Sequence, residues 1–225
     1  MTLMLHYFPT LNAHKVTIAL EEMGLPYEIA VVDIAAGDQH SALFRAINPN
    51  SRIPALVDDD DPAAPVTVFE SAAILQYLGR KSGLLYPAAE PPRARIDSWL
   101  FWQMSALGPM SGQVNYYNRL SARDGAEAFA YPLSRYRRET ARLFAVLEEG
   151  LAGDAYLAGD YSIADICAFT WVNQFPDNGG GLAPYPALSD WHARIMARPA
   201  VQRGLAVRSD LFQRLAERRK DKTLP

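Results

Sequence analysis

A proline-rich stretch, "LLYPAAEPPRAR", divides the chain into two parts of different hydrophobic periodicity, and this division constrains the fold most strongly. Before it, short β-branched runs alternate with segments whose apolar residues recur at helical spacing. After it, only the helical period remains. The sequence therefore predicts an α/β + all-α organisation, with an α/β domain over residues 1–83, a linker over residues 84–92 and an all-helical domain over residues 93–225.

The order of elements in the first part indicates a single mixed sheet. The runs "LMLHYF", "YEIAVVDI", "IPALVD" and "VTVF" have strand length and composition. The last two are separated by the turn-rich "DDDPAAP", which favours an antiparallel hairpin. Helical segments follow the first, second and fourth runs, so the predicted order is βαβαββα, with helices covering a four-stranded sheet.

The composition limits the partners and the compartment that we expect. The chain has 225 residues, a formal net charge of −3 and one cysteine, Cys167. A charge this small indicates no nucleic-acid partner, and no apolar run approaches the roughly 20 residues of a membrane helix. One cysteine cannot form an internal disulfide, which fits a cytoplasmic protein. The histidines lack the paired spacing of a zinc site, so no metal is expected.

The turn before the first predicted helix carries polar groups where a thiol is usual. In "YFPTLNAHKVTIALEEMGL" a strand end, a turn and a helix follow one another, and thiol-redox domains of this shape usually keep a cysteine at the helix start. Here the turn carries Thr10 and Asn12. Their hydroxyl and amide groups, together with the backbone N–H groups that open the helix, are donors suited to an anion.

Two further motifs have both a structural and a ligand-binding interpretation. Ile53-Pro54 is either an ordinary loop proline or a cis-proline turn that leaves the Ile53 backbone to pair with a peptide-like ligand. Glu70 and Ser71 stand at a helix start, where they either cap the helix or bind a carboxylate at the positive end of its dipole. The sequence leaves both alternatives open.

The motif "YSIADICAF" in the helical part has a structural interpretation. Ser162 and Asp165 have the spacing of a capping box, in which each side chain bonds to the backbone of the other. Cys167 follows on an apolar helix, where a free cysteine commonly behaves as a small hydrophobic residue. We therefore interpret this thiol as inert.

Taken in order, the motifs resemble the glutathione transferase family over nearly the whole chain. They are "YFPT-NAHKVTIALEE", "NPNSRIPALVD", "FESAAILQYL" and "YSIADI". The stretches "LFWQMSALGPMSGQ", "SRYRRETARL" and "PAVQRGL" resemble the bacterial nu class most, although Leu11 stands where nu-like proteins often have proline. The resemblance implies a thioredoxin-like first domain, an all-helical second domain and a homodimer.

The resemblance also implies a glutathione site. Glutathione or glutathione disulfide is expected along the Ile53-Pro54 turn, with its γ-glutamyl end at Glu70 and Ser71 and its glycyl end at Gln39. The implied binding residues are Asn12, Gln39, Arg52, Ile53, Pro54, Glu70, Ser71 and Arg135.

The implied activity is the reduction of a small disulfide by bound glutathione, without a protein thiol. Thr10 and Asn12 are the expected donors to the glutathione sulfur, and Tyr7 is the alternative, since it resembles the activating tyrosine of other classes. Two other functions stay open. The protein could conjugate glutathione to a hydrophobic electrophile, or it could bind glutathione without catalysis.

Overall fold

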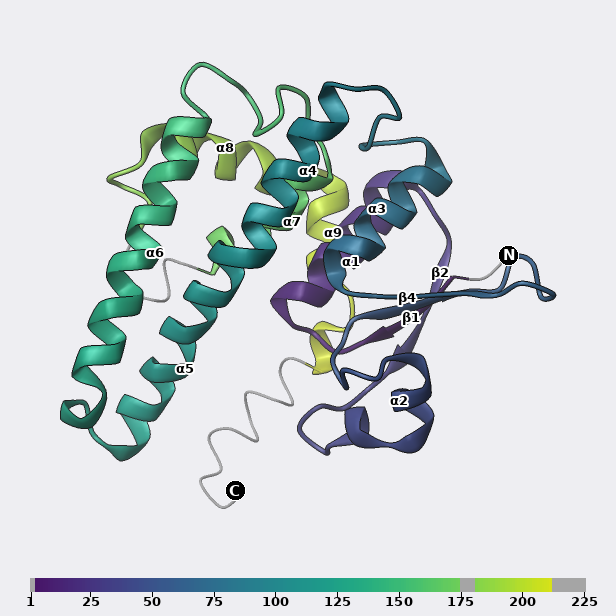
Figure 1. Cartoon of the computed structure of the whole chain (residues 1–225), viewed down its shortest axis with the longest axis horizontal. Coiled ribbons are helices and arrows are strands. Elements are labelled where there is room, and N and C mark those ends of the chain that lie inside the picture. The colour runs from purple at the N-terminus through teal and green to yellow at the C-terminus, as the bar shows by residue number, and fades with distance from the viewer. Residues whose placement is uncertain (1–2, 175–180, 212–225) are drawn as a thin grey trace. The chain divides into compact units, whose positions relative to one another are not determined.

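The computed structural model describes residues 3–174 and 181–211, which form two compact units. The first unit contains the described residues 3–84 and 198–211, and the second contains the described residues between 85 and 197. Figure 1 shows strands covered by helices in the first unit and long helices in the second.

The first unit contains the predicted four-stranded sheet. Its elements are β1 (Leu3–Tyr7), α1 (Leu11–Met23), β2 (Tyr27–Val31), η1 (Asp38–His40), α2 (Ala42–Ile47), β3 (Ala55–Asp58), β4 (Val66–Phe69), α3 (Ser71–Ser82) and α9 (Pro199–Ala206). The strands lie in the order β2-β1-β3-β4; β1 runs parallel to β2 and antiparallel to β3, and β3 and β4 form an antiparallel hairpin. The predicted βαβαββα order is confirmed.

The register of this sheet gathers four chain segments at one end. Tyr7 of β1 lies opposite Val31 of β2, so these two strands finish together. Ala55, where β3 begins, lies opposite His6 of β1 and Phe69 of β4. The loops that follow β1 and β2, the loop that enters β3 and the start of α3 therefore share one end of the sheet.

Helix α1 is buried on nearly all sides. It begins at the N-cap Thr10 and ends at Gly24, whose φ of 64° lies in the left-handed region that glycine adopts without strain. Val16, Ile18 and Leu20 are completely buried, and α1 packs against helices α3 and α9. Burying one such side chain stabilises the fold by about 1.5–3 kcal/mol.

Helix α9 packs along α1, although it comes after the whole helical part of the sequence. A Cβ atom on Gly204 would lie 2.6 Å from the Ile18 Cα, so only glycine permits this approach. The Thr17 hydroxyl donates to the Gly204 carbonyl at 2.8 Å, and Arg198 forms an ion pair with Glu22 at 2.6 Å. The predicted helical domain over residues 93–225 included α9. The contacts of α9 instead place it in the first unit.

The regular secondary structure in the described part of the second unit is helical, apart from one isolated bridge between Ala158 and Asp160. Its elements are α4 (Pro92–Trp102), the π-helical turn η2 (Gln103–Leu107), α5 (Gly108–Asp124), η3 (Glu127–Phe129), α6 (Ala130–Gly150), α7 (Ile163–Asn173) and α8 (Pro186–Met196). The all-helical fold class is confirmed. No helix in the described ranges is both long and apolar enough to cross a membrane.

The predicted capping box at the start of α7 is confirmed. The Ser162 side chain accepts from the helix backbone, and Asp165 accepts from the Ser162 N–H at 3.0 Å. The buried Asp165 carboxylate also accepts from the Leu157 N–H at 3.0 Å and from the Trp191 indole at 2.8 Å. One carboxylate thus joins the start of α7 to the preceding loop and to α8.

Cys167 lies two residues after Asp165 in α7. Its side chain is completely buried, and its thiol donates to Gln103 Oε1 at 2.9 Å. A thiol without solvent access and with its hydrogen directed to an amide oxygen is not placed to act as a nucleophile.

We predict that Asp165→Ala lowers the free energy of unfolding by about 3–5 kcal/mol, because several buried donors lose their acceptor. Urea denaturation followed by circular dichroism measures the change. Asp190→Ala, at an exposed position of α8, is the control and should change stability by less than about 0.5 kcal/mol. Equal effects of the two substitutions would contradict the proposed contribution of the Asp165 carboxylate.

Candidate functional site

The candidate site lies at the sheet end where β1 and β2 finish. There the register brings together the N-terminus of α1, the loop after β2, the turn before β3 and the N-terminus of α3. Seven of the predicted site residues outside β1 belong to these segments: Thr10, Asn12, Gln39, Arg52, Ile53, Pro54 and Ser71, with Glu70 directly before α3.

Thr10 and Asn12 occupy the first turn of α1. Thr10 is the N-cap, with extended backbone angles, and its Oγ1 accepts from the Ala13 N–H at 3.4 Å. Both side chains are half-buried. The first turn carries no acidic side chain, so nothing within it neutralises the positive end of the dipole. This turn is suited to hold an anion next to a hydroxyl and an amide.

The Tyr7 hydroxyl is bonded to a different segment, the one that follows α9. Its side chain is completely buried, and its hydroxyl donates to the Val207 carbonyl at 3.1 Å and lies 3.4 Å from His14 Nδ1. Burial raises the pKa of Tyr7 well above its ordinary value and lowers the pKa of His14. At neutral pH the phenol is therefore protonated, and its one hydrogen is used to hold the segment after α9.

The Ile53-Pro54 peptide bond is cis. Asn48, which is almost completely buried, shapes the loop before it: its amide donates to the Arg52 carbonyl, and its Oδ1 accepts from the Asn50 N–H at 2.9 Å. Within the described residues, the Ile53 N–H and carbonyl make no backbone hydrogen bond. An extended peptide ligand can therefore pair with them as an added strand does.

Asn48 was not predicted as a site residue. Its sequence context, a helix end followed by proline, identifies a turn but not the two hydrogen bonds that the side chain makes across it. Asx side chains that bond to nearby backbone groups are a known turn signal, and that signal is the one that could have identified Asn48.

Glu70 and Ser71 stand between β4 and α3. Glu70 has φ 70° and ψ 120°, an unusual conformation for a residue with a side chain, and it is exposed. Ser71 is buried and accepts a hydrogen bond from Lys15 Nζ at 3.4 Å. Lys15 was not predicted either, because a lysine within a helix usually reaches solvent.

Gln39 and Arg52 complete this end of the sheet. Gln39 lies in η1, where its Nε2 donates to the Ile34 carbonyl at 3.4 Å, while its buried Oε1 has no partner among the described residues. Arg52 is exposed, and its guanidinium makes no ion pair within the described part of the chain. This end of the sheet thus offers an amide acceptor at Gln39 and a cation at Arg52, next to Ile53 in the sequence.

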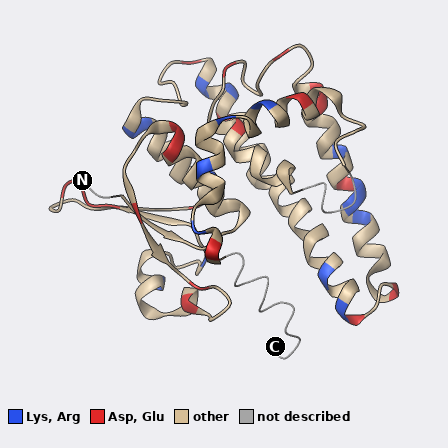
Figure 2. Ribbon diagram, turned by 180° about the vertical axis from the view of Figure 1, so that it is seen from behind, with Lys and Arg blue, Asp and Glu red and all other residues tan. Residues whose placement is uncertain are grey.

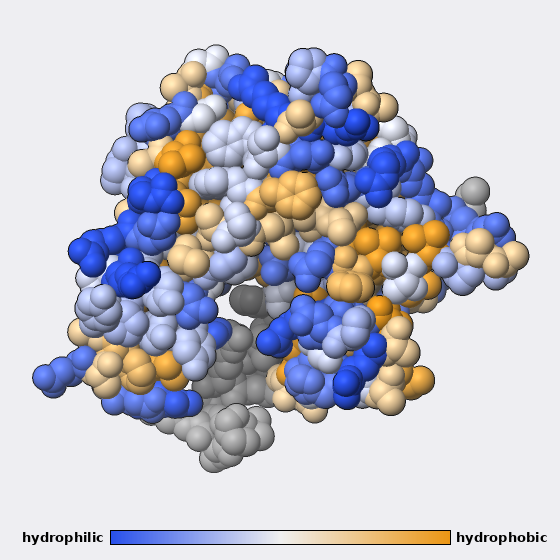
Figure 3. All heavy atoms as spheres, viewed as in Figure 1, coloured by the Kyte–Doolittle hydropathy of each residue, from blue (hydrophilic) through white to orange (hydrophobic). Residues whose placement is uncertain are grey.

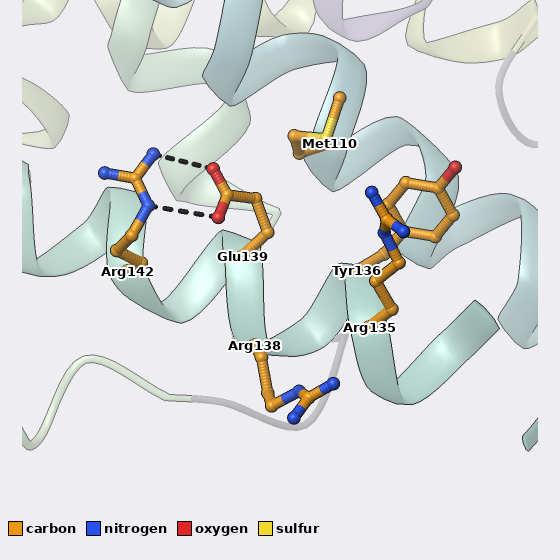
Figure 4. A pocket seen from close by; sticks show the side chains of 6 residues that line it. All are labelled: Met110, Arg135, Tyr136, Arg138, Glu139 and Arg142. Atoms are coloured by element: carbon orange, nitrogen blue, oxygen red, sulfur yellow. Dashed lines mark hydrogen bonds and ion pairs between the residues drawn. The ribbon is translucent and has the colours of Figure 1, made fainter. Parts of the chain in front are cut away.

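Arg135 belongs to the second unit, on α6. It lines a pocket of about 570 Å³, together with Met110 of α5 and the α6 residues Tyr136, Arg138, Glu139 and Arg142 (Figure 4). Arg142 is paired with Glu139 at 2.6 Å. The pocket is therefore basic, since two of its three guanidinium groups lie outside this ion pair.

The charges elsewhere are mixed in sign. Figure 2 shows acidic and basic residues spread over both units, and Figure 3 shows polar residues interspersed with small apolar groups on the face it presents. Exposed apolar residues include Val66 and Phe69 of the edge strand β4. Across residues 3–174 and 181–211, no cluster of side chains has the composition of a metal site.

Two family models match the chain. The model described as the glutathione S-transferase N-terminal domain matches residues 11–81, and the one described as the glutathione S-transferase C-terminal domain matches residues 133–199. The first match contains the sheet end described above, except for Tyr7 and Thr10.

Similar proteins support the same relationship. The disulfide-bond oxidoreductase YfcG of Escherichia coli is 42% identical over 204 residues, which cover 89% of this chain and 93% of that protein. A glutathione transferase family member from Pseudomonas fluorescens, with two glutathione bound, has a TM-score of 0.85 and 40% identity, covering 90% of this chain and 92% of the other. A glutathione transferase from Pseudomonas putida, with one glutathione disulfide bound per subunit, has a TM-score of 0.84 and 38% identity, covering 92% of each chain.

We predict that Asn48→Ala lowers the free energy of unfolding by about 1–3 kcal/mol, because two backbone groups of the turn lose their partner. Urea denaturation measures this change. Asn50→Ala removes an exposed amide from the same loop and should change stability by less than about 0.5 kcal/mol. If the two variants are equally stable, the Asn48 side chain does not hold the turn.

Proposed function

The chain belongs to the glutathione S-transferase family, as its motifs predicted, and from this premise we propose that it is a glutathione-dependent disulfide-bond reductase. One observation carries the proposal: the N-terminus of α1 carries Thr10 and Asn12, and no cysteine, at the same end of the sheet as the turn at Ile53. The 42% identity to a disulfide-bond oxidoreductase supports this activity over others in the family.

In the proposed complex, glutathione pairs with the backbone of Ile53 beside Pro54. Its γ-glutamyl amine faces Glu70, and its α-carboxylate meets the N-terminus of α3 at Ser71. Arg52 lies near the same peptide, and Gln39 lies at its glycyl part. Arg135 is included as a further contact from the family resemblance alone. Relatives with bound glutathione or glutathione disulfide support the choice of ligand.

The protein then acts on the thiol that glutathione brings. A free thiol has a pKa of about 8.5, so only a few per cent is ionised at neutral pH. Each unit by which the pKa is lowered corresponds to about 1.36 kcal/mol of preferential stabilisation of the thiolate. Thr10, Asn12 and the N–H groups of α1 are the donors that supply this stabilisation.

The proposed reaction consists of two thiol–disulfide exchanges. The glutathione thiolate attacks one sulfur of a small disulfide, forms a mixed disulfide, and releases the other sulfur as a thiolate that takes up a proton. A second glutathione thiolate attacks the glutathione sulfur of the mixed disulfide, which yields glutathione disulfide and the second substrate thiol. Two electrons pass from two glutathione molecules to the substrate.

The same bound thiolate could instead attack a hydrophobic electrophile, which is the conjugating reaction of a transferase. The family descriptions favour this second function. Parallel assays of glutathione with a small disulfide and with an aromatic halide distinguish the two, and inactivity in both would indicate a glutathione-binding protein. We further propose that the protein is a homodimer, which rests on the family resemblance. A cytoplasmic location is proposed because the chain has a single cysteine, which is buried.

We predict that Thr10→Ala and Asn12→Ala each lower the rate of disulfide reduction about tenfold, because each removes one donor to the thiolate in a partly wet site. Tyr7→Phe should have a much smaller effect, since its hydroxyl donates to Val207. Initial rates across pH report both the activity and the thiol pKa. If Tyr7→Phe abolishes turnover while Thr10→Ala leaves it unchanged, the strand tyrosine is the donor and this assignment is wrong.

We also predict that Cys167→Ala retains nearly all of the disulfide reductase activity, because the reacting sulfurs belong to glutathione and to the substrate. Circular dichroism should first establish that the variant is folded. A folded variant without activity would contradict a mechanism that uses no protein thiol.

A further inference from the structure

The segment that follows α9 returns to the sheet end that holds the proposed glutathione site. The Val207 carbonyl accepts from the hydroxyl of Tyr7, the last residue of β1, at 3.1 Å. The same hydroxyl lies 3.4 Å from Nδ1 of His14, the fourth residue of α1. Arg208 comes directly after Val207, so it lies close to the first turn of α1. The proposed thiol chemistry does not use this arginine.

Arg208 has an unusual backbone conformation. Its φ is 50°, in the left-handed region that residues with a side chain seldom adopt. Four residues other than glycine have a positive φ in the described part of the chain, and two of the others, Ser51 and Glu70, belong to the loop before β3 and to the residue that precedes α3. Such conformations cluster at catalytic and ligand-binding sites, where the surrounding structure maintains them. Arg208 is therefore a candidate site residue at the same end of the sheet.

Neighbouring contacts hold Arg208 in this conformation. On one side the Tyr7 hydroxyl fixes the Val207 carbonyl, and on the other side the Leu211 N–H donates to the Arg208 carbonyl at 3.0 Å. Leu211 is buried. The backbone is thus fixed before and after Arg208, so its Cα–Cβ bond has one direction before any ligand binds. A contact that is organised in advance costs less ordering entropy when the ligand arrives.

The Arg208 guanidinium keeps a donor for a ligand. Its Nε and Nη2 donate to the Asp210 carboxylate at 3.0 and 3.1 Å, while Nη1 makes no hydrogen bond to any residue that the structure describes. The side chain is 39% exposed, so a ligand can reach it. Burial raises the pKa of Tyr7, and the positive charge of Arg208 opposes this rise. The guanidinium therefore acts electrostatically at the end of β1.

We propose that Arg208 determines the specificity of the reaction for its second substrate, and that this substrate is a disulfide that carries a carboxylate within a few bonds of its sulfur atoms. The inference rests on the proposed function, which places the attacking thiolate at the start of α1. A disulfide sulfur has to reach the same place, so a charged group close to that sulfur comes beside Arg208. A carboxylate there accepts from the guanidinium, whereas an ammonium group is repelled by it.

The surrounding charges also favour an acidic substrate. The N-terminus of α1 carries a positive partial charge, and no acidic side chain lies in its first turn. Asp210 offsets part of the Arg208 charge, but both side chains are partly exposed, and an ion pair of this kind is weak. A carboxylate on the substrate can therefore bind through Nη1 while Asp210 keeps the guanidinium in place.

The test compares three disulfides of equal chain length that differ in charge: 3,3′-dithiodipropionate, bis(2-hydroxyethyl) disulfide and cystamine. Initial rates of glutathione disulfide formation give kcat/KM for the wild type, Arg208→Gln and Arg208→Lys. We expect the wild type to prefer the acidic disulfide over the cationic one. Arg208→Gln should lose about tenfold in kcat/KM for the acidic disulfide and less than about twofold for the neutral one. Arg208→Lys, which keeps the charge, should retain most of the preference.

Two further variants separate the contact from other effects. Arg203→Gln removes the same charge from an exposed position of α9, where Arg203 pairs with Glu21 at 2.7 Å, and it should leave the ratios between the three kcat/KM values unchanged. Arg208→Gly keeps the backbone conformation, because glycine adopts a φ of 50° without strain, and it should lose the preference as Arg208→Gln does.

An unchanged preference in Arg208→Gln or in Arg208→Gly would overturn the inference. An equal loss of kcat/KM for all three disulfides would also overturn it, as would a wild type that does not prefer the acidic disulfide. A wild-type protein that reduces none of the three disulfides would instead refute the proposed function on which the inference rests.

Discussion

The packing of helix α1 is the constraint on which the rest of the first unit depends. It packs against α3 and against α9, whose Gly204 approaches Ile18 closely enough to exclude any side chain. The Thr17 hydroxyl and the ion pair between Arg198 and Glu22 fix its position along this contact. A helix N-terminus stabilises an anion only if it does not have to move to reach it. The rigid placement of α1 is therefore part of the proposed chemistry.

Because the proposed site contains no protein thiol, oxidation takes place on glutathione and not on the protein. The one cysteine of the chain, Cys167, lies in the second unit, is completely buried and donates to Gln103. In the proposed reaction the oxidised product is a small molecule that leaves, so the protein passes through no disulfide-linked or over-oxidised state of its own. Exchange at a moderately acidified thiol is also faster than at a strongly acidified one, because nucleophilicity falls with pKa. In the proposed mechanism a hydroxyl and an amide supply this moderate shift of the thiol pKa.

The sequence predicted the features that depend on local chemistry. The order of strands and helices and the Ser162–Asp165 capping box both follow from signals within a few residues. Features set by distant contacts were missed. The periodicity of residues 199–206 identifies a helix but not its partner, and α9 packs on α1 rather than with its sequence neighbours. The burial of Lys15 escaped prediction for the same reason, since it arises from the approach of α3.

The Tyr7 hydroxyl already donates a structural hydrogen bond, so it does not also donate to the sulfur of a ligand. A phenol has a single hydrogen to donate. Here that hydrogen goes to the Val207 carbonyl, and burial raises the pKa of Tyr7 so that the phenol stays protonated. The hydroxyl thereby joins the end of β1 to the segment after α9, the helix that packs against α1. In the proposed mechanism the donors to the glutathione sulfur are therefore the next polar groups along the chain, Thr10 and Asn12 at the start of α1.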